Sequence, residues 1–460
     1  MLIATHSKLP NLASASDAVL HMRHDLTNFL AESMKHIDVT NVMTHAMSTV
    51  AGILQVGDVS IPLRNKKNII IISVGKAAIP MCVVAVRALE AAMEPSQRLR
   101  GIAVGPGDPT LLPKVVSYFA GGHPFPNQAS WQAAEAALDL LTPLGSDDLV
   151  LFLISGGASA MIEAPTDPLI TCEQMEEFYR ALVYSGLPIT SMNALRKHLS
   201  KVKGGRLALA ASPAQQLSII ISDVPGTDLD MVGSGPSLAD PSTIEDCLRI
   251  LAQPSLRDII GFRILRYFES PHLLETPKPN HTALRRSSRV CLLSNDILLS
   301  HVAQLANRAG YYVEVDVSCD DWHYQDAATF LLNKVRSLRE THKRVCLISG
   351  GELSVQVAQS EGLGGRNQHF LLHCAVNLRS SDPPLVLLSV GTDGVDGNSP
   401  AAGAIVDSFT LARIAERGLD PLTALERFDS YSLFHALGDT VVTGPTGNNV
   451  RDLRIFLSAD

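Results

Sequence analysis

Residues 68–78 are Asn-Ile-Ile-Ile-Ile-Ser-Val-Gly-Lys-Ala-Ala, a short apolar run that ends in Gly75 and Lys76. Such a run, rich in β-branched side chains and without alternation, is typical of a parallel strand covered on both faces. Five later runs have the same character, and they occupy residues 149–154, 216–222, 289–293, 345–348 and 385–390. The sequence therefore predicts parallel sheets.

Segments with helical periodicity lie between these runs, for example 130–141 and 300–309. A leading segment, 25–56, also repeats apolar residues at steps of three and four, beginning with Leu26 and Phe29. Strands that alternate with helices indicate βαβ units, which right-handed crossovers wind into open sheets. We expect an α/β fold that begins with helix over 25–56.

The length of the chain, 460 residues, exceeds what one ordinary hydrophobic core supports, so two domains are expected. The strongest internal break is 269–288, where three prolines stand among polar residues. Polar, proline-rich stretches of this kind often connect domains. We predict an N-terminal domain over 1–280 and a C-terminal domain over 281–460.

Composition and charge argue against several classes of protein. The formal net charge is −8, and Lys and Arg are scattered, so a nucleic-acid partner is not expected. No apolar run approaches the ~18 residues of a membrane span. The seven cysteines include no Cys-x-x-Cys pair, which indicates a reducing compartment. We expect a cytoplasmic protein; a mitochondrial leader in 1–16 and a homodimer are left open.

The ends of the predicted strands carry the functional hypothesis, because ligands bind beside strand carboxyl ends in open α/β sheets. Glycine pairs there let backbone N–H groups converge on an anion such as phosphate, although they also permit a tight turn that binds nothing. No P-loop is present, and no Gly-x-Gly-x-x-Gly motif opens a helix. Two strand ends share one sequence, Ser155-Gly156-Gly157 and Ser349-Gly350-Gly351.

Charged residues near the strand ends favour phosphoryl chemistry. Lys76 follows a buried strand, where its charge is costly unless it meets an anion. Arg366 follows three glycines, and its planar guanidinium suits a carboxylate or a phosphate. Asp393 and Asp396 could present oxygens to Mg²⁺, although an Asp before Gly is more often a turn residue. His369, on an expected helix, is interpreted as a packing or surface residue.

Several motifs occur in an order that resembles the glycerate 2-kinase family, and the resemblance spans about residues 20–457. It rests on Val74-Gly75-Lys76-Ala77-Ala78, Gly121-Gly122-His123-Pro124, Ser155-Gly156-Gly157-Ala158-Ser159-Ala160, Gly364-Gly365-Arg366-Asn367-Gln368 and Gly391-Thr392-Asp393-Gly394-Val395-Asp396-Gly397. Each motif alone is common, but the combination is specific.

The resemblance implies a larger N-terminal Rossmann-like domain with a parallel sheet, a smaller C-terminal α/β domain of the MOFRL type, and an active site in the interdomain cleft. It implies an ATP-dependent phosphotransferase with an alcohol acceptor, which uses ATP and Mg²⁺ to convert D-glycerate to 2-phosphoglycerate. Lys76 and Arg366 match the leading functional residues of the family. Its members often have Glu where this chain has His369, so we assign that position no role.

We combine the resemblance with electrostatics into one expected site. Lys76 and Arg366 hold the anionic substrate and the moving phosphoryl group, and Asp223 accepts the hydroxyl proton unless it only caps a turn. The other expected roles are phosphate and nucleotide binding by Ser155, Gly156, Gly157, Ser349, Gly350 and Gly351, substrate binding by Asn295, and Mg²⁺ binding by Asp393 and Asp396.

Two other functions are weighed against the kinase. Relatives of the family have been labelled hydroxypyruvate reductases, but an NAD(P)H-dependent dehydrogenase should carry the dinucleotide motif that this chain lacks. A non-catalytic sensor of sugar acids or nucleotides is the second alternative, because a fold does not determine a function. An assay of ATP consumption against NADH oxidation separates the first alternative from the kinase.

Overall fold

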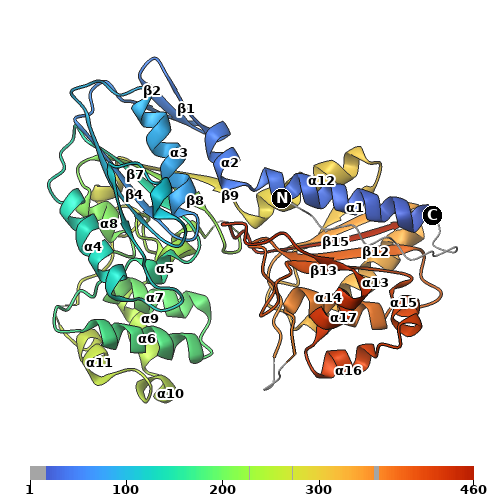
Figure 1. Ribbon diagram of the computed structural model, residues 1–460. Helices are drawn as coiled ribbons and strands as arrows, with labels where there is room; N and C mark the ends of the chain where they lie inside the picture. Colours follow the sequence, from blue (N-terminus) through green and yellow to red (C-terminus); the bar gives the residue numbers. More distant parts are fainter. Residues whose placement is uncertain (1–16, 227, 272, 357–361) are drawn as a thin grey trace. The chain divides into compact units, whose positions relative to one another are not determined.

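The computed structural model describes residues 17–226, 228–271, 273–356 and 362–460. The chain divides into two compact units: unit 1 joins Met1–Asp38 to Ser294–Asp460, and unit 2 is Val39–Leu293 (Figure 1). The leader considered in 1–16 lies outside the described residues. Within the described part of the chain, no helix is both long enough and apolar enough to cross a membrane.

Unit 2 is built on a six-stranded sheet with the order β6-β5-β4-β7-β8-β9, and all neighbouring strands are parallel. This is the order of a doubly wound Rossmann sheet, so the predicted fold is confirmed. The strands are β4 (Asn68–Val74), β5 (Arg98–Val104), β6 (Val116–Phe119), β7 (Leu149–Ile154), β8 (Gln215–Ile221) and β9 (Ser287–Leu293).

Helices cover both faces of this sheet, which is why its central strands are apolar throughout. One face packs against α3 (Ala78–Glu90), and the other packs against α4 (Gln128–Leu141) and α8 (Arg206–Ala210) (Figure 1). A separate helical layer has its own apolar core and comprises α6 (Cys172–Tyr184), α7 (Ile189–Leu199), α9 (Ile244–Leu251), α10 (Pro254–Arg257) and α11 (Phe262–Phe268).

The helix predicted over 25–56 is correct only in its first part. After α1 (Asp17–His36) and α2 (Val39–Ala46), the chain forms a small antiparallel sheet of β1 (Met47–Val50), β2 (Ile53–Val56) and β3 (Val59–Pro62). Residues Ala51 and Gly52 turn the chain with positive φ angles, which ends any helix there. The prediction is therefore wrong for 47–56.

Unit 1 is built on a mixed sheet with the order β10-β11-β15-β12-β13-β14. Only β10 and β11 are parallel; the other neighbours are antiparallel. The parallel prediction is therefore wrong for 385–390, and for 345–348 it is correct only on the side of β10. The strands are β10 (Tyr312–Val315), β11 (Arg344–Ser349), β12 (Leu385–Gly391), β13 (Gly403–Asp407), β14 (Thr440–Val441) and β15 (Asp452–Ala459).

Helices also cover both faces of the unit 1 sheet. The first face carries α1 and α12 (Asn295–Arg308) (Figure 1). The second carries α13 (Tyr324–Thr341), α14 (Arg366–Val376), α15 (Thr410–Glu416), α16 (Pro421–Glu426) and α17 (Ser430–Leu437). Helix α1 belongs here, although it starts the chain, because its apolar side chains are buried on this sheet and Arg23 pairs with Asp407 and Asp439.

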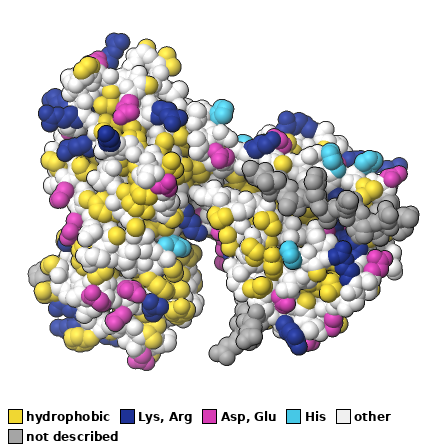
Figure 2. Space-filling model, viewed as in Figure 1, with side chains coloured by type: hydrophobic (Ala, Val, Ile, Leu, Met, Phe, Trp, Pro, Cys, Tyr) yellow, Lys and Arg dark blue, Asp and Glu magenta, His cyan; other side chains and the backbone are white. Residues whose placement is uncertain are grey.

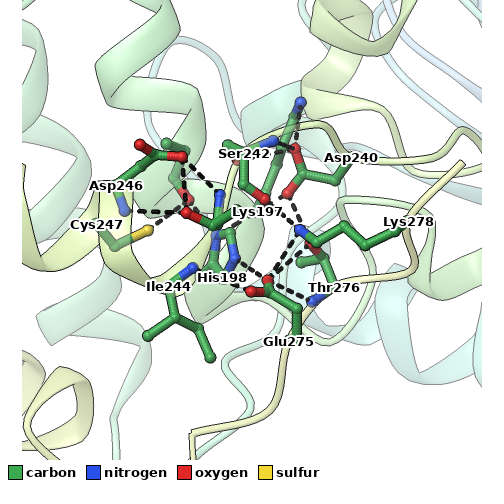
Figure 3. Close-up of polar contacts among 12 residues, drawn as sticks. Lys197, His198, Asp240, Ser242, Ile244, Asp246, Cys247, Glu275, Thr276 and Lys278 are labelled. Atoms are coloured by element: carbon green, nitrogen blue, oxygen red, sulfur yellow. Dashed lines mark hydrogen bonds and ion pairs between the residues drawn. The ribbon is translucent and has the colours of Figure 1, made fainter.

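The segment 269–288, predicted as a linker, lies inside unit 2 and is bound to α7 through side chains (Figure 3). His198 Nε2 contacts Glu275 Oε1 at 2.6 Å, and Thr276 Oγ1 donates at 2.8 Å to Asp240, which pairs with Lys197 Nζ. The chain then continues into β9, the sixth strand of the sheet. The boundary between the units therefore follows Leu293, which corrects the predicted division at 280.

The cysteines are unpaired, and the charged side chains are spread over the face of the molecule in view (Figure 2). None of the seven cysteines, all of which are described, forms a disulfide bond, and five are buried. Figure 2 shows Lys and Arg side chains dispersed over the visible face rather than gathered in one stripe. This distribution gives no support to a nucleic-acid partner.

Candidate active site

The candidate site in unit 2 lies where the strand order of the sheet reverses. Strands β4 and β7 are hydrogen-bonded neighbours, and β5 and β8 lead away from them in opposite directions. Ligands of doubly wound proteins bind at the carboxyl ends of the strands at this switch point. Gly75 and Lys76 follow β4 at this point, and the Ser155-Gly156-Gly157 turn follows β7.

Backbone contacts hold these two turns together. Lys76 N–H donates to the Gly156 carbonyl at 2.9 Å, and Ala77 N–H donates to Ser155 Oγ at 3.0 Å. Gly75 has a φ of +124°, and a Cβ there would lie 2.3 Å from Ser155 Oγ, so only glycine fits. The hydroxyl of Ser155, predicted to bind phosphate, instead accepts a hydrogen bond within the turn.

Asp223 and His123 flank the glycine turn. A Cβ on Gly156 would lie 2.1 Å from Asp223 Oδ2, and a Cβ on Gly157 would lie 3.1 Å from His123 Cδ2. Desolvation lowers the pKa of His123, and the positive charge of Lys76 lowers it further. The structure thus brings the predicted residues Gly156, Gly157 and Asp223 together. It adds His123, which the sequence analysis named only as part of a motif.

A chain of hydrogen bonds supports the turn through α5 (Ala158–Met161). Ser159 Oγ lies 2.9 Å from Ser234 Oγ, and Ser234 donates to Asn193 Oδ1 at 2.9 Å. Since a hydroxyl has one proton, Ser159 is the donor in the first of these bonds. Tyr179 OH lies 2.8 Å from the Ser159 carbonyl. These residues lie far apart in the sequence; Ser159 and Ser234 belong to motifs of the family, whereas no pattern marked Asn193 and Tyr179.

The second glycine turn, after β11 in unit 1, has a different environment. Gly351 N–H donates to Asn295 Oδ1 at 3.1 Å, and Glu352 N–H donates to Asp320 Oδ1 at 3.0 Å. The carbonyls of Gly350 and Gly351 accept from Arg454 at 2.6 and 3.0 Å. Protein side chains therefore occupy the Gly351 N–H and the carbonyls of both glycines in this turn. This argues against the phosphate role predicted for this turn.

Asn295 has a structural place in the same turn. A Cβ on Gly350 would lie 1.9 Å from its Oδ1, and its Nδ2 donates to the carbonyls of Val450 and Asp452 at 2.8 and 3.1 Å. The side chain is buried and its amide is engaged at both ends. This geometry argues against the predicted substrate contact. Ser349 of the turn is also buried.

Arg366, at the start of α14, is held by two carboxylates. Its Nε and Nη2 donate to Asp452 at 2.7 and 2.9 Å, and Nη2 lies 3.1 Å from Glu352. Burial opposes its charge, but Asp452 outweighs this effect and raises the pKa of Arg366. The side chain is 34% exposed and lines a cavity of about 420 Å³ with His369 and other residues of unit 1. Arg366 can therefore still reach a ligand.

The two aspartates predicted to bind Mg²⁺ do not form a common ligand set. Asp396 is 2% exposed, and its carboxylate accepts the N–H groups of Asn367 and Gln368 at 3.0 and 2.9 Å, which caps α14. Burial raises the pKa of Asp396 to about 6 against these donors. Asp393 is partly exposed and accepts Val395 N–H. Among the described residues, no three metal-ligating side chains converge, so the pair does not fit the predicted site.

His369, which the sequence analysis interpreted as a packing or surface residue, packs inside unit 1. It is buried in α14, and its ring stacks on Phe428 with a centroid distance of 4.6 Å. Burial lowers the pKa of His369 to about 4, and the nearby His373 adds to this effect. The ring is therefore neutral near pH 7.

Comparisons with known proteins agree on one family. A family model described as "Domain of unknown function (DUF4147)" matches residues 25–269, and the model of the "MOFRL family" matches residues 345–452. D-glycerate 2-kinase of Thermotoga maritima is 34% identical over 405 residues, which cover 86% of this chain and 92% of that protein. Human glycerate kinase is 32% identical, covering 88% of this chain and 86% of its own length.

Two further comparisons bear on the fold and on the alternative function. The crystal structure of glycerate kinase from Thermotoga maritima aligns with a TM-score of 0.78 at 30% identity, covering 96% of this chain and all of that one. A provisionally named hydroxypyruvate reductase of Agrobacterium vitis is 35% identical, covering 86% of this chain and 89% of its own.

Proposed function

Because this chain belongs to the glycerate kinase family, we propose that it is a glycerate 2-kinase. It transfers the γ-phosphoryl group of ATP to the 2-hydroxyl of D-glycerate, an alcohol acceptor, and yields ADP and 2-phosphoglycerate. The observation that supports this best is the meeting of Lys76, Asp223 and the Gly156-Gly157 turn at the switch point of a Rossmann sheet.

Phosphoryl transfer needs positioning and charge stabilisation more than covalent chemistry. Lys76 stabilises the negative charge on the moving phosphoryl group, and the N–H groups of Gly156 and Gly157 bind its oxygens. Asp223 accepts the proton of the attacking hydroxyl as the new O–P bond forms and the bond to ADP breaks. His123 is neutral beside Lys76 and leaves the lysine as the cation of this site.

Because Asp396 is committed to capping α14, the phosphates of ATP rather than Asp396 would hold Mg²⁺, which would neutralise their charge. Asp393 remains the partly exposed member of the predicted pair and can contact that metal. Arg366, in unit 1, provides a second cation for the reactants, so turnover requires residues of both units. The interdomain location of the active site stays a prediction, as does assembly into a homodimer.

The hydroxypyruvate reductase alternative is less well supported. A dinucleotide-binding turn needs three glycines after the first strand and an acidic residue after the second. The turn after β4 has Lys76-Ala77-Ala78 in that place, and Gly105 follows β5 directly. The sensor alternative predicts ligand binding without turnover.

One assay distinguishes these functions. The purified protein is given MgATP with D-glycerate while ADP is coupled to a dehydrogenase signal, and separately NADH with hydroxypyruvate. The kinase proposal predicts ADP formation that depends on D-glycerate, with phosphorus NMR identifying the phosphorylated hydroxyl. NADH oxidation without ADP formation would instead identify a reductase, and binding without either reaction would identify a sensor.

A further inference from the structure

Arg196 of α7 is a buried cation that no carboxylate neutralises. The residue is 7% exposed. Among the residues that the structure describes, it forms no ion pair, and its Nε has no hydrogen-bond partner. The neighbouring carboxylate of Glu163 pairs instead with Lys203 Nζ at 2.7 Å and accepts from Tyr179 OH at 2.5 Å. Buried arginines without a counter-charge are rare in folded proteins.

The next residue of α7, Lys197, is a buried cation whose charge is neutralised by carboxylates. Lys197 is only 2% exposed, but its Nζ lies 3.1 Å from Asp240 (Figure 3) and 2.7 Å from Asp230. Arg196 has only the ring of Tyr179, which lies 4.6 Å from its Cζ. A cation–π contact offsets a small part of the desolvation penalty of a buried charge. Packing alone therefore does not account for a guanidinium here.

The surroundings of Arg196 connect it to the candidate active site. The hydroxyl of Tyr179, on whose ring Arg196 stacks, lies 2.8 Å from the carbonyl of Ser159, two residues after Gly157. Asn193 lies one helical turn before Arg196, on the same side of α7, and accepts from Ser234, which contacts Ser159. The cation and the glycine turn are thus linked by a short chain of contacts within unit 2.

We propose that Arg196 binds the carboxylate of the hydroxy-acid substrate. This assignment rests on the proposed function and adds a substrate-recognition residue to it. The planar fork of a guanidinium matches a carboxylate with two parallel hydrogen bonds, and the low exposure strengthens that pairing. Lys76 and the glycine turn then remain available for the phosphoryl group. The substrate anion supplies the missing counter-charge.

The test compares three variants of the full chain. Arg196→Met removes the charge, Arg196→Lys keeps it without the fork, and Arg180→Met is a matched control. Arg180 also stacks on an aromatic ring, Phe125, at 4.2 Å, but its side chain is 49% exposed and pairs with Glu176. Titration calorimetry with D-glycerate gives the affinity, and initial rates give the KM for D-glycerate and for ATP.

We expect Arg196→Met to weaken D-glycerate binding by about 30-fold or more, as for a lost buried charge pair. The KM for ATP should change by less than about 3-fold, since nucleotide contacts are not removed. Arg196→Lys should fall between Arg196→Met and the native protein, and Arg180→Met should match the native protein. Circular dichroism and thermal melting verify folding, and Arg196→Lys keeps the test valid should the Met variant not fold.

Hydroxypyruvate, titrated in parallel, separates this proposal from the proposed function because it shares the carboxylate but lacks the glycerate hydroxyl at C2. The protein could bind hydroxypyruvate in a way that depends on Arg196 and yet not bind D-glycerate. This result would contradict the proposed kinase function and support the carboxylate site. Unchanged affinity for both acids in folded Arg196→Met would overturn the assignment. A rise in the KM for ATP alone would also overturn it, because Arg196 would then bind a nucleotide phosphate.

Discussion

The turns after β7 and β11 share the sequence Ile-Ser-Gly-Gly, yet they lie in opposite environments. Side chains of the protein fill the turn after β11, where Asn295 and Asp320 accept its N–H groups and Arg454 binds its carbonyls. The turn after β7 instead adjoins groups that suit a ligand, with Lys76 on one strand and Asp223 beside its first glycine.

The difference shows that a glycine pair at a strand end permits anion binding but does not determine it. Anion binding depends on whether oxygens from other parts of the chain already accept the N–H groups of the turn. Where they do, these N–H groups cannot bind a ligand. In unit 1 these oxygens come from Asn295 and Asp320, and in unit 2 the carboxylate of Asp223 lies beside Gly156, where we propose that the substrate binds. We therefore assign a catalytic role to the first turn, after β7, and a stabilising role to the second turn, after β11.

The largest effect is expected from Lys76→Ala, which removes the cation of the first turn. Turnover should fall by several powers of ten, because loss of a charge-stabilising group costs about 3 kcal/mol or more of barrier. Steady-state kinetics on the folded variant measure this. Lys67→Ala is the control, since Lys67 precedes the same strand with a side chain 76% exposed. Near-normal turnover in Lys76→Ala would remove the lysine from the mechanism.

Gly156→Ala tests the first turn itself. The new Cβ would displace the carboxylate of Asp223, which lies 2.1 Å from its position, and a misplacement of this size costs about 100-fold in kcat/KM. The free energy of unfolding should change by less than about 1 kcal/mol, because a side chain can move. Gly261→Ala, where nothing lies within 4 Å of a Cβ, serves as the control. A large loss of stability with unchanged kinetics would reverse our assignment.

Asn295→Ala tests the second turn, where the expected loss is in stability. It leaves three buried backbone groups without their partner, which should lower the free energy of unfolding by about 2–4 kcal/mol. The KM for D-glycerate should stay within about 3-fold of the native value. Urea denaturation and kinetics are compared with Asn307→Ala, an exposed position of the same helix. A raised KM in a stable variant would restore Asn295 as a substrate residue.

The smallest effect concerns the pH dependence of the polar cluster around Glu275 in unit 2 (Figure 3). Burial alone would raise the pKa of Glu275, but hydrogen bonds from Lys278 and His198 outweigh it and lower the pKa from 4.5 to about 2. The carboxylate therefore stabilises the fold above pH 4.5, and this contribution is lost as the pH falls through 2.

The charge of Glu275 should contribute about 1–2 kcal/mol, a value reduced because its side chain is 39% exposed. Urea denaturation of the native protein and Glu275→Gln at pH 7, 4.5 and 3 measures it. The difference between the two proteins should shrink as the pH falls. A difference that stays constant over this range would show that Glu275 acts through packing.

The sequence predicted all six of the marked strands, because uniformly apolar runs of this length require burial on both faces. It could not distinguish parallel from antiparallel pairing in unit 1, since β11 and β12 are covered on both faces of a mixed sheet. The partner that sets their direction, β15, is contributed by the end of the chain. Pairing of this kind is a long-range property.

The candidate site was only partly predictable, for the same reason. Lys76 and Asp223 could be assigned to the candidate site because each follows a strand that the sequence marks clearly. The role of Gly350 was misjudged because Asn295, 55 positions away, fills its turn. Arg196 gave no local signal, since a basic residue on an amphipathic helix is normally exposed. Its significance depends on the absence of a carboxylate, which only the folded protein reveals.

The most direct test of the different roles of the two turns follows their backbone N–H groups. Protein labelled with ¹⁵N-glycine is titrated with a non-hydrolysable MgATP analogue and D-glycerate, and Gly156, Gly157, Gly350 and Gly351 are assigned by single substitutions. The account predicts large shifts for Gly156 and Gly157, since their N–H groups bind the phosphoryl oxygens, and small shifts for Gly350 and Gly351. Large shifts confined to Gly350 and Gly351 would contradict it.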